Sequence, residues 1–149
     1  MKRKSILGVT LLEIMLVLAI AAMVIVMSIR YYQTATASEQ VNTVMEQLQA
    51  ITAAADNLAQ ASGSYASANI SNGTLLTVLP ATALSLPWGS TISVTDIGAT
   101  SYTISLPNVP GNQCPLLASK IATNTHFSMS ACGGGTAATN ITVTYSSTT

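Results

Sequence analysis

One carboxylate and one glycine near the start of the chain have the types and spacing to do chemistry together. Residues 9–29 are apolar enough for a membrane span, and Glu13 is the only charged residue among them. A charge at the centre of such a helix costs roughly 2.5–3.5 kcal/mol, and somewhat less near an end. If the chain is cut after Gly8, the new α-amino group of Val9 is a cation that could face Glu13 of a neighbouring copy. The spacing therefore predicts an ion pair between copies of the chain.

A resemblance to a known signal covers the same residues. Residues 8–13 read Gly-Val-Thr-Leu-Leu-Glu and follow a short basic leader. They resemble the class III signal of type IV prepilins and type II secretion pseudopilins, in which a membrane peptidase cuts after the glycine and methylates the exposed amine. The resemblance implies a cleaved leader at residues 1–8, a cut between Gly8 and Val9, N-methylation of Val9, and Glu13 as the assembly acid.

The charges that flank the apolar segment predict its orientation. Three basic residues precede the segment, and only Arg30 closely follows it. Basic residues are retained on the cytoplasmic side, so the N-terminus should be cytoplasmic and the body of the protein should lie outside. The resemblance places the precursor in the bacterial inner membrane and the product in an extracellular pilus. A conventional secretory signal, cut near residues 35–37, is the alternative, but twenty-one apolar residues with an embedded acid are too long for one.

The composition gives no sign of a nucleic-acid partner. Only 7% of the residues are charged and the formal net charge is +0. Ordinary soluble domains are about 25% charged. Removal of the leader leaves Arg30 and Lys120 against five acidic residues. The mature chain is therefore mildly acidic, whereas nucleic-acid binding requires clustered basic residues.

A single long helix is expected from residue 9 to residue 62, a stretch with neither Gly nor Pro. At 1.5 Å per residue it spans about 80 Å, and Gly63 is expected to end it. Residues 9–30 should form the transmembrane or filament-core half and residues 31–62 the amphipathic half. Weak helix formers at residues 34–38 predict a bend or local melting there. Apolar positions then recur every three or four residues and must pack on something, namely Val41, Val44, Met45, Leu48, Ile51, Ala55 and Leu58.

Residues 63–149 are expected to form a β-rich head domain. Short runs of β-branched and aromatic residues predict strands at 75–79, 91–95, 102–106 and 141–145. Glycines and prolines separate the runs, and residues 133–135 form a glycine turn. Pro115 is tolerated in the first turn of a second helix at 114–121. The predicted fold class is α+β, with the long helix packed on a small antiparallel sheet.

Cys114 and Cys132 are the two cysteines of the chain. In a small exported domain an even pair most often forms one disulfide. A loop of about 19 residues would make that bond worth roughly 3 kcal/mol. A free buried pair is the alternative.

The head also resembles a known family, though less specifically than the N-terminus does. Residues 86–94, 102–106 and 109–120 are similar to the globular domain of type IVb pilins, in which a C-terminal disulfide staples the region exposed on the filament. The resemblance therefore implies the type IV pilin fold with a disulfide between Cys114 and Cys132. The short leader departs from the type IVb pattern. Val9 in place of phenylalanine, and Arg30 where many type IVa pilins have a proline, favour type IVb.

Three functional classes follow, and the first is a structural pilus subunit. Its implied partners are identical subunits, the prepilin peptidase, and an inner-membrane assembly platform with its ATPase. The second is a pseudopilin of a type II secretion system, which shares the anchor; major pseudopilins usually carry a calcium loop and no disulfide. The third is an enzyme or receptor domain on a membrane stalk.

Catalysis, a cofactor and a metal site are not expected. No nucleophile, base and orienting group recur at a recognisable spacing. His126 has no cluster of ligands beside it in the sequence, and Asp56 and Asp96 are isolated. Trp88 is expected to be a packed corner residue.

Overall fold

The computed structural model describes residues 7–96, 98–135 and 137–147. Most of the predicted leader, residues 1–6, lies outside this range. The chain divides into two compact units, Met1–Thr36 and Ala37–Thr149. The predicted domain boundaries at residues 8, 30 and 62 were placed by the cleavage signal, by hydropathy and by the helix end. The division into compact units does not test them, and they stay predictions.

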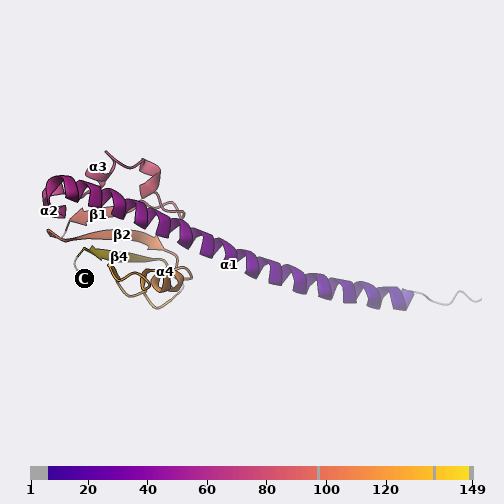
Figure 1. The fold of residues 1–149 in the computed structure, drawn as a ribbon. Helices are drawn as coiled ribbons and strands as arrows, with labels where there is room; N and C mark the ends of the chain where they lie inside the picture. Colours follow the sequence, from indigo (N-terminus) through magenta and orange to yellow (C-terminus); the bar gives the residue numbers. More distant parts are fainter. Residues whose placement is uncertain (1–6, 97, 136, 148–149) are drawn as a thin grey trace, which may run out of the picture. The chain divides into compact units, whose positions relative to one another are not determined.

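The long helix α1 runs from Leu7 to Ser62 and belongs to both units (Figure 1). It continues through residues 34–38, so the expected local melting is wrong. Two of these residues are alanines, the strongest helix formers, and the threonines and the serine are weaker by only a few tenths of a kcal/mol per residue. That difference is too small to open a helix held on both sides. The predicted end is confirmed: Gly63 has a φ of +89°, and its N–H donates to the Ala59 carbonyl at 2.7 Å.

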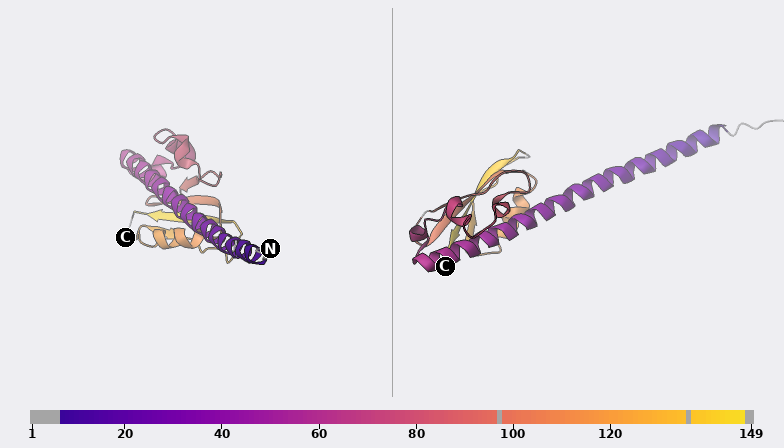
Figure 2. Two further views of the ribbon diagram at one scale, coloured as in Figure 1. Left: turned by 90° about the vertical axis from the view of Figure 1, so that its right-hand side faces the viewer. Right: turned by 90° about the horizontal axis from the view of Figure 1, so that it is seen from above.

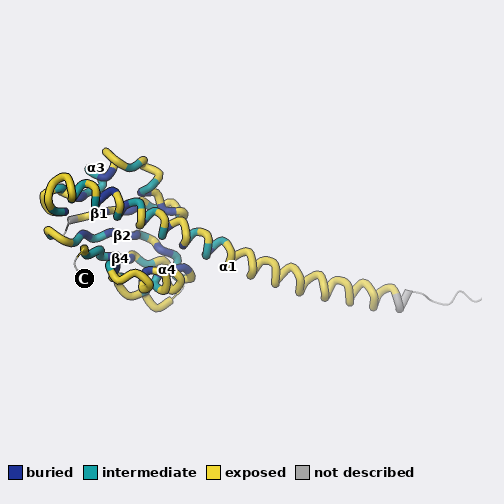
Figure 3. The backbone as a smooth tube through the Cα atoms, in the orientation of Figure 1, coloured by how far each residue is buried: buried dark blue, intermediate teal, exposed yellow. Residues whose placement is uncertain are grey.

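The second half of α1 buries the predicted stripe. Figure 3 shows buried and exposed positions alternating along this half. The members at positions three and four apart lie on one face and enter the core of the second unit. Five of them are buried, namely Val41, Val44, Leu48, Ile51 and Ala55. Met45 and Leu58 are partly buried and pack against the same core.

A four-stranded antiparallel sheet packs on this face of α1 (Figure 2). Its strands are β1 (Ser93–Asp96), β2 (Ser101–Val109), β3 (Phe127–Met129) and β4 (Thr139–Ser146), in the order β1-β2-β4-β3. Alternate residues of β2 point into the core, as the two-residue period of a strand requires. The buried ones are Tyr102, Ile104 and Leu106, and Val109 is also buried after a register shift that follows Leu106.

Short helices fill the connections. They are α2 (Tyr65–Ala68), α3 (Asn72–Leu75), the 3-10 helix η1 (Ala81–Leu84) and α4 (Cys114–Ile121). The bounds of α4 are those predicted. The overall α+β fold, with a long N-terminal helix packed on a small antiparallel sheet, is confirmed.

The strand predicted at residues 75–79 is wrong. Leu75 is the last residue of α3 and residues 76–79 form turns, because a capping box at Ser71 starts a helix there. The Ser71 N–H donates to Thr74 Oγ1 at 2.9 Å, and the Ser71 hydroxyl accepts from the Thr74 N–H. Such local bonds compete with strand formation.

Two strand details were also not predicted. Strand β1 begins at Ser93, since Thr91 pairs instead with Ser85 in an isolated bridge. Strand β3 has only three residues and pairs with β4 alone. Three residues are too few to show a period, so the sequence carried no signal for β3.

Candidate functional site

The junction between Gly8 and Val9 lies in the first turns of α1. Its backbone is helical, and its side chains lie outside the described set. The predicted cut and methylation at this junction stay predictions.

Glu13 lies on an exposed face of α1, beside a shallow hollow of 390 Å³. The hollow is also lined by Thr10, Ile14, Val17 and Leu18, none of which carries a charge. A carboxylate on such a face accepts hydrogen bonds and attracts a cation. Within this face of the helix the cation must come from another molecule.

The apolar half of α1 is uncovered. Every side chain from residue 10 to residue 35 is exposed, and the large apolar ones reach 68% at Leu12 and 71% at Met27 (Figure 3). Patches this large mark membrane or protein interaction sites. Among the described residues, α1 is also the one helix long and apolar enough to cross a membrane.

Two hydroxyl groups in this half make hydrogen bonds within the helix. The Ser28 hydroxyl donates to the Val24 carbonyl at 2.8 Å, and the Thr34 hydroxyl donates to the Arg30 carbonyl at 3.1 Å. These bonds to the residue four positions earlier satisfy both hydroxyl donors before the helix enters an apolar medium. Residues 10–29 can therefore enter lipid or an apolar bundle with Glu13 as their one charge.

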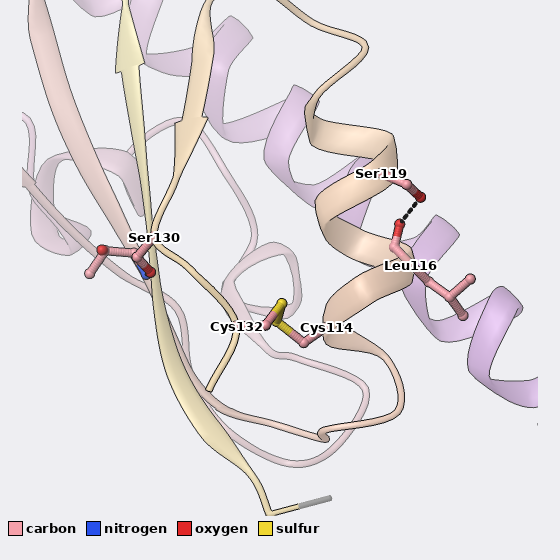
Figure 4. Close-up of a disulfide and its surroundings, with 6 residues drawn as sticks. Cys114, Leu116, Ser119, Ser130 and Cys132 are labelled. Carbon is pink, nitrogen blue, oxygen red and sulfur yellow. Dashed lines mark hydrogen bonds between the residues drawn. A yellow bond between two sulfur atoms is a disulfide. The ribbon is translucent and has the colours of Figure 1, made fainter. Parts of the chain in front are cut away.

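A disulfide joins Cys114 to Cys132 (Figure 4). Cys114 is the first residue of α4 and is 1% exposed, while Cys132 lies in the segment that follows β3. Within α4 the Ser119 hydroxyl donates to the Leu116 carbonyl at 2.8 Å. The disulfide therefore ties the start of α4 to the segment just after β3, across a sequence separation of 18.

Trp88 and His126 have structural contacts. The Trp88 indole N–H donates to the Pro107 carbonyl at 2.9 Å, and its ring packs against the core, which confirms the predicted corner role. His126 Nδ1 lies 3.1 Å from the Ser146 carbonyl oxygen, to which it donates. Within the described part of the chain, no three His, Cys, Asp or Glu residues gather as metal ligands.

Two groups of residues were not found from the sequence. Gln113 is buried and its side-chain amide donates to Gln40 Oε1, which links the start of α4 to α1. Asp56 accepts a hydrogen bond of 2.5 Å from the Tyr65 hydroxyl, beside Tyr102 and Tyr145. Gln40 and Gln113 are 73 residues apart, and Asp56 and Tyr65 lie on different helices, so no helical or strand period joins either pair.

The long apolar helix, the antiparallel sheet and the disulfide define an α+β protein of the pilin-like class. A family model described as PilS N terminal matches residues 38–149. The chain therefore belongs to this pilin-related family. No curated protein matches the chain.

The matched region and the N-terminal signal are separate observations. The match begins at residue 38, next to the first residue of the second compact unit, Ala37. It therefore covers the head and the second half of α1. The family indicates a pilus-related role without relying on the residues around Gly8.

Proposed function

We propose that the chain is the structural subunit of a type IV pilus, made as a membrane-anchored precursor. The observation that carries the proposal is the first half of α1, which is exposed from residue 10 to residue 35 and carries one acid, Glu13. A pilin-related head is attached to this helix. Lipid covers such a helix before assembly, and identical copies cover it afterwards.

Processing supplies the missing cation. Hydrolysis of the peptide bond between Gly8 and Val9 frees the α-amino group of Val9, and methylation leaves it able to carry a proton. Two charges 4 Å apart attract by about 4 kcal/mol at an effective dielectric of 20, before desolvation is subtracted. Pairing this amine with Glu13 of a neighbour is possible at only one axial offset between the two helices, so the ion pair favours that offset. Repeated head-to-tail contacts that never close produce a fibre.

The proposal includes the partners of such a subunit. These are identical subunits, the prepilin peptidase, and the inner-membrane assembly platform with its ATPase. The precursor is a single-pass protein with its N-terminus in the cytoplasm, and the product lies in the extracellular pilus. We also propose that the subunit is of the type IVb kind, which the head resembles.

A pseudopilin of a type II secretion system is the second candidate. It shares the anchor and Glu13, so α1 does not separate the two classes. The disulfide between Cys114 and Cys132 supports the pilin, since major pseudopilins usually lack one.

Surface fibres provide the test. Electron microscopy of fibres sheared from producing cells should show long filaments, and mass spectrometry of their main subunit should show a chain that begins at N-methylated Val9. Gly8→Ser should leave the leader attached, whereas Ser5→Ala, a change of similar size inside the leader, should not. A working fibre subunit that retains residues 1–8 would refute the proposal.

A further inference from the structure

Two neighbouring clefts in the second unit meet at Asp56. The larger has a volume of 520 Å³ and lies at the end of α1, where the chain turns at Gly63. The smaller has a volume of 250 Å³. Both are lined by Asp56 and Tyr145, so these two residues form the wall between them.

Asp56 brings an uncompensated negative charge to this wall. Its side chain is partly buried, and Oδ1 accepts the Tyr65 hydroxyl hydrogen bond of 2.5 Å. A carboxylate has about four acceptor sites, and one neutral donor does not cancel its charge. Neither cleft contains a lysine or arginine among its described lining residues. Lys120, the one Lys or Arg in residues 37–149, is exposed on α4.

Aromatic rings line the two clefts beside the carboxylate. The rings of Tyr65 and Tyr145 lie 6.2 Å apart at 89°, and the ring of His126 lies 5.9 Å from that of Tyr145. The fully buried Tyr102 packs 5.1 Å from Tyr65 and 5.0 Å from Tyr145, which fixes both rings. Cations are attracted to the faces of such rings at distances up to about 6 Å.

We propose that this Asp56 cleft binds a small organic ammonium group, either free or at the tip of a lysine side chain. The carboxylate supplies the opposite charge and a hydrogen-bond acceptor, and the tyrosine rings supply an apolar wall that favours cations. A neutral or anionic group would leave the carboxylate without its counter-charge. The site is distinct from Glu13 and does not depend on filament assembly.

An NMR titration of the full chain in nonionic detergent micelles tests the proposal. Ethylammonium and tetramethylammonium should shift the ring signals of Tyr65 and Tyr145 in a saturable way, and ethanol should not. Asp56→Asn should weaken ethylammonium binding about tenfold or more, because a charge-assisted contact is lost. Glu46→Gln, which neutralises an exposed carboxylate on the same helix, should leave the binding unchanged.

A second variant leaves Asp56 in place. Ala99 lines the larger cleft, and its backbone carbonyl accepts a hydrogen bond from the Tyr65 N–H at 3.1 Å. Ala99→Arg should fill the cleft with a cation from the chain itself and abolish ethylammonium binding, whereas Ala99→Gln should retain it. Equal binding by the wild type, Asp56→Asn and Ala99→Arg would overturn the proposal. So would an equal response to ethanol.

The same spectra distinguish the two sources of the ammonium group. If Lys120 of another copy is the natural occupant, raising the protein concentration should shift the signals of Tyr65 and Tyr145, and Lys120→Gln should remove this effect. Signals that do not depend on concentration would assign the site to a free amine.

Discussion

At the scale of single residues, the assembly proposed above depends on the charge of Glu13. Glu13→Gln keeps the shape of the side chain and removes the charge that would meet the Val9 amine. We expect a subunit that is still processed, folded and inserted in the membrane, with fibre yield reduced to background. Fibre yield from sheared cells and subunit level in the membrane fraction measure the two effects.

The control for this variant is Glu39→Gln, which makes the same chemical change at an exposed position further along α1. It should leave fibre yield at the wild-type level. Abundant fibres from Glu13→Gln would remove Glu13 from the mechanism.

The buried tyrosines make stability depend on pH in the alkaline range. Burial raises the pKa of Tyr65 and of Tyr102 above the ordinary value of 10.0, and the hydrogen bond to Asp56 raises that of Tyr65 further. Above about pH 10 the unfolded chain releases these phenolic protons while the folded chain keeps them. The unfolded state then binds fewer protons, so the free energy of unfolding falls as the pH rises.

Urea unfolding between about pH 7 and 11 measures this dependence. Tyr65→Phe should make the fall above about pH 10 shallower, because one of the two titrating groups is gone. Tyr31→Phe is the control, since Tyr31 is 79% exposed on α1. An identical pH profile for Tyr65→Phe and the wild type would contradict the assignment.

At the scale of elements, the disulfide holds α4 against the end of β3. Replacing both cysteines, Cys114→Ala with Cys132→Ala, leaves no free thiol and removes the constraint on the unfolded chain. We expect the free energy of unfolding to fall by about 3 kcal/mol, as for other loops of this length. Denaturant unfolding of the double variant, compared with the oxidised and reduced wild type, measures the loss.

The reduced wild type should match the double variant to within the small cost of removing two sulfur atoms. If the oxidised wild type and the double variant unfold at the same denaturant concentration, the bond does not stabilise the head.

At the scale of the whole molecule, one compact unit has a buried apolar core and the other exposes its apolar side chains. The core lies within residues 37–149, while every side chain of residues 10–35 is exposed and most of them are apolar. Residues 37–149 alone should therefore form a soluble monomer with its disulfide closed. Size-exclusion chromatography and circular dichroism of this fragment, without detergent, check the expectation.

The full chain is the comparison for this experiment and should require detergent or lipid. Aggregation or a disordered spectrum of the fragment would show that the first half of α1 is needed to fold the head.

Several features followed from the sequence because they are local. A stretch without glycine or proline, a three-and-four spacing and Gly63 predicted the long helix, its buried face and its end. Pro115 in a first turn predicted α4, and two cysteines in a domain expected to be exported predicted their pairing. Each depends on residues that are close in the chain or on a single matched pair.

Other features were decided only by the tertiary structure. Strand β3 forms because its backbone can pair with the edge of β4. Residues 75–79 form the end of α3 and a turn because the cap at Ser71 competes with strand formation. The contacts of Gln113 with Gln40, and of Asp56 with Tyr65, arise only after the chain reverses direction. The sequence by itself determined a long helix, whose apolar half carries one acid, and a β-rich head. Folding decided which polar groups meet, because contacts between distant residues depend on how the whole core closes and leave no periodic trace in the chain.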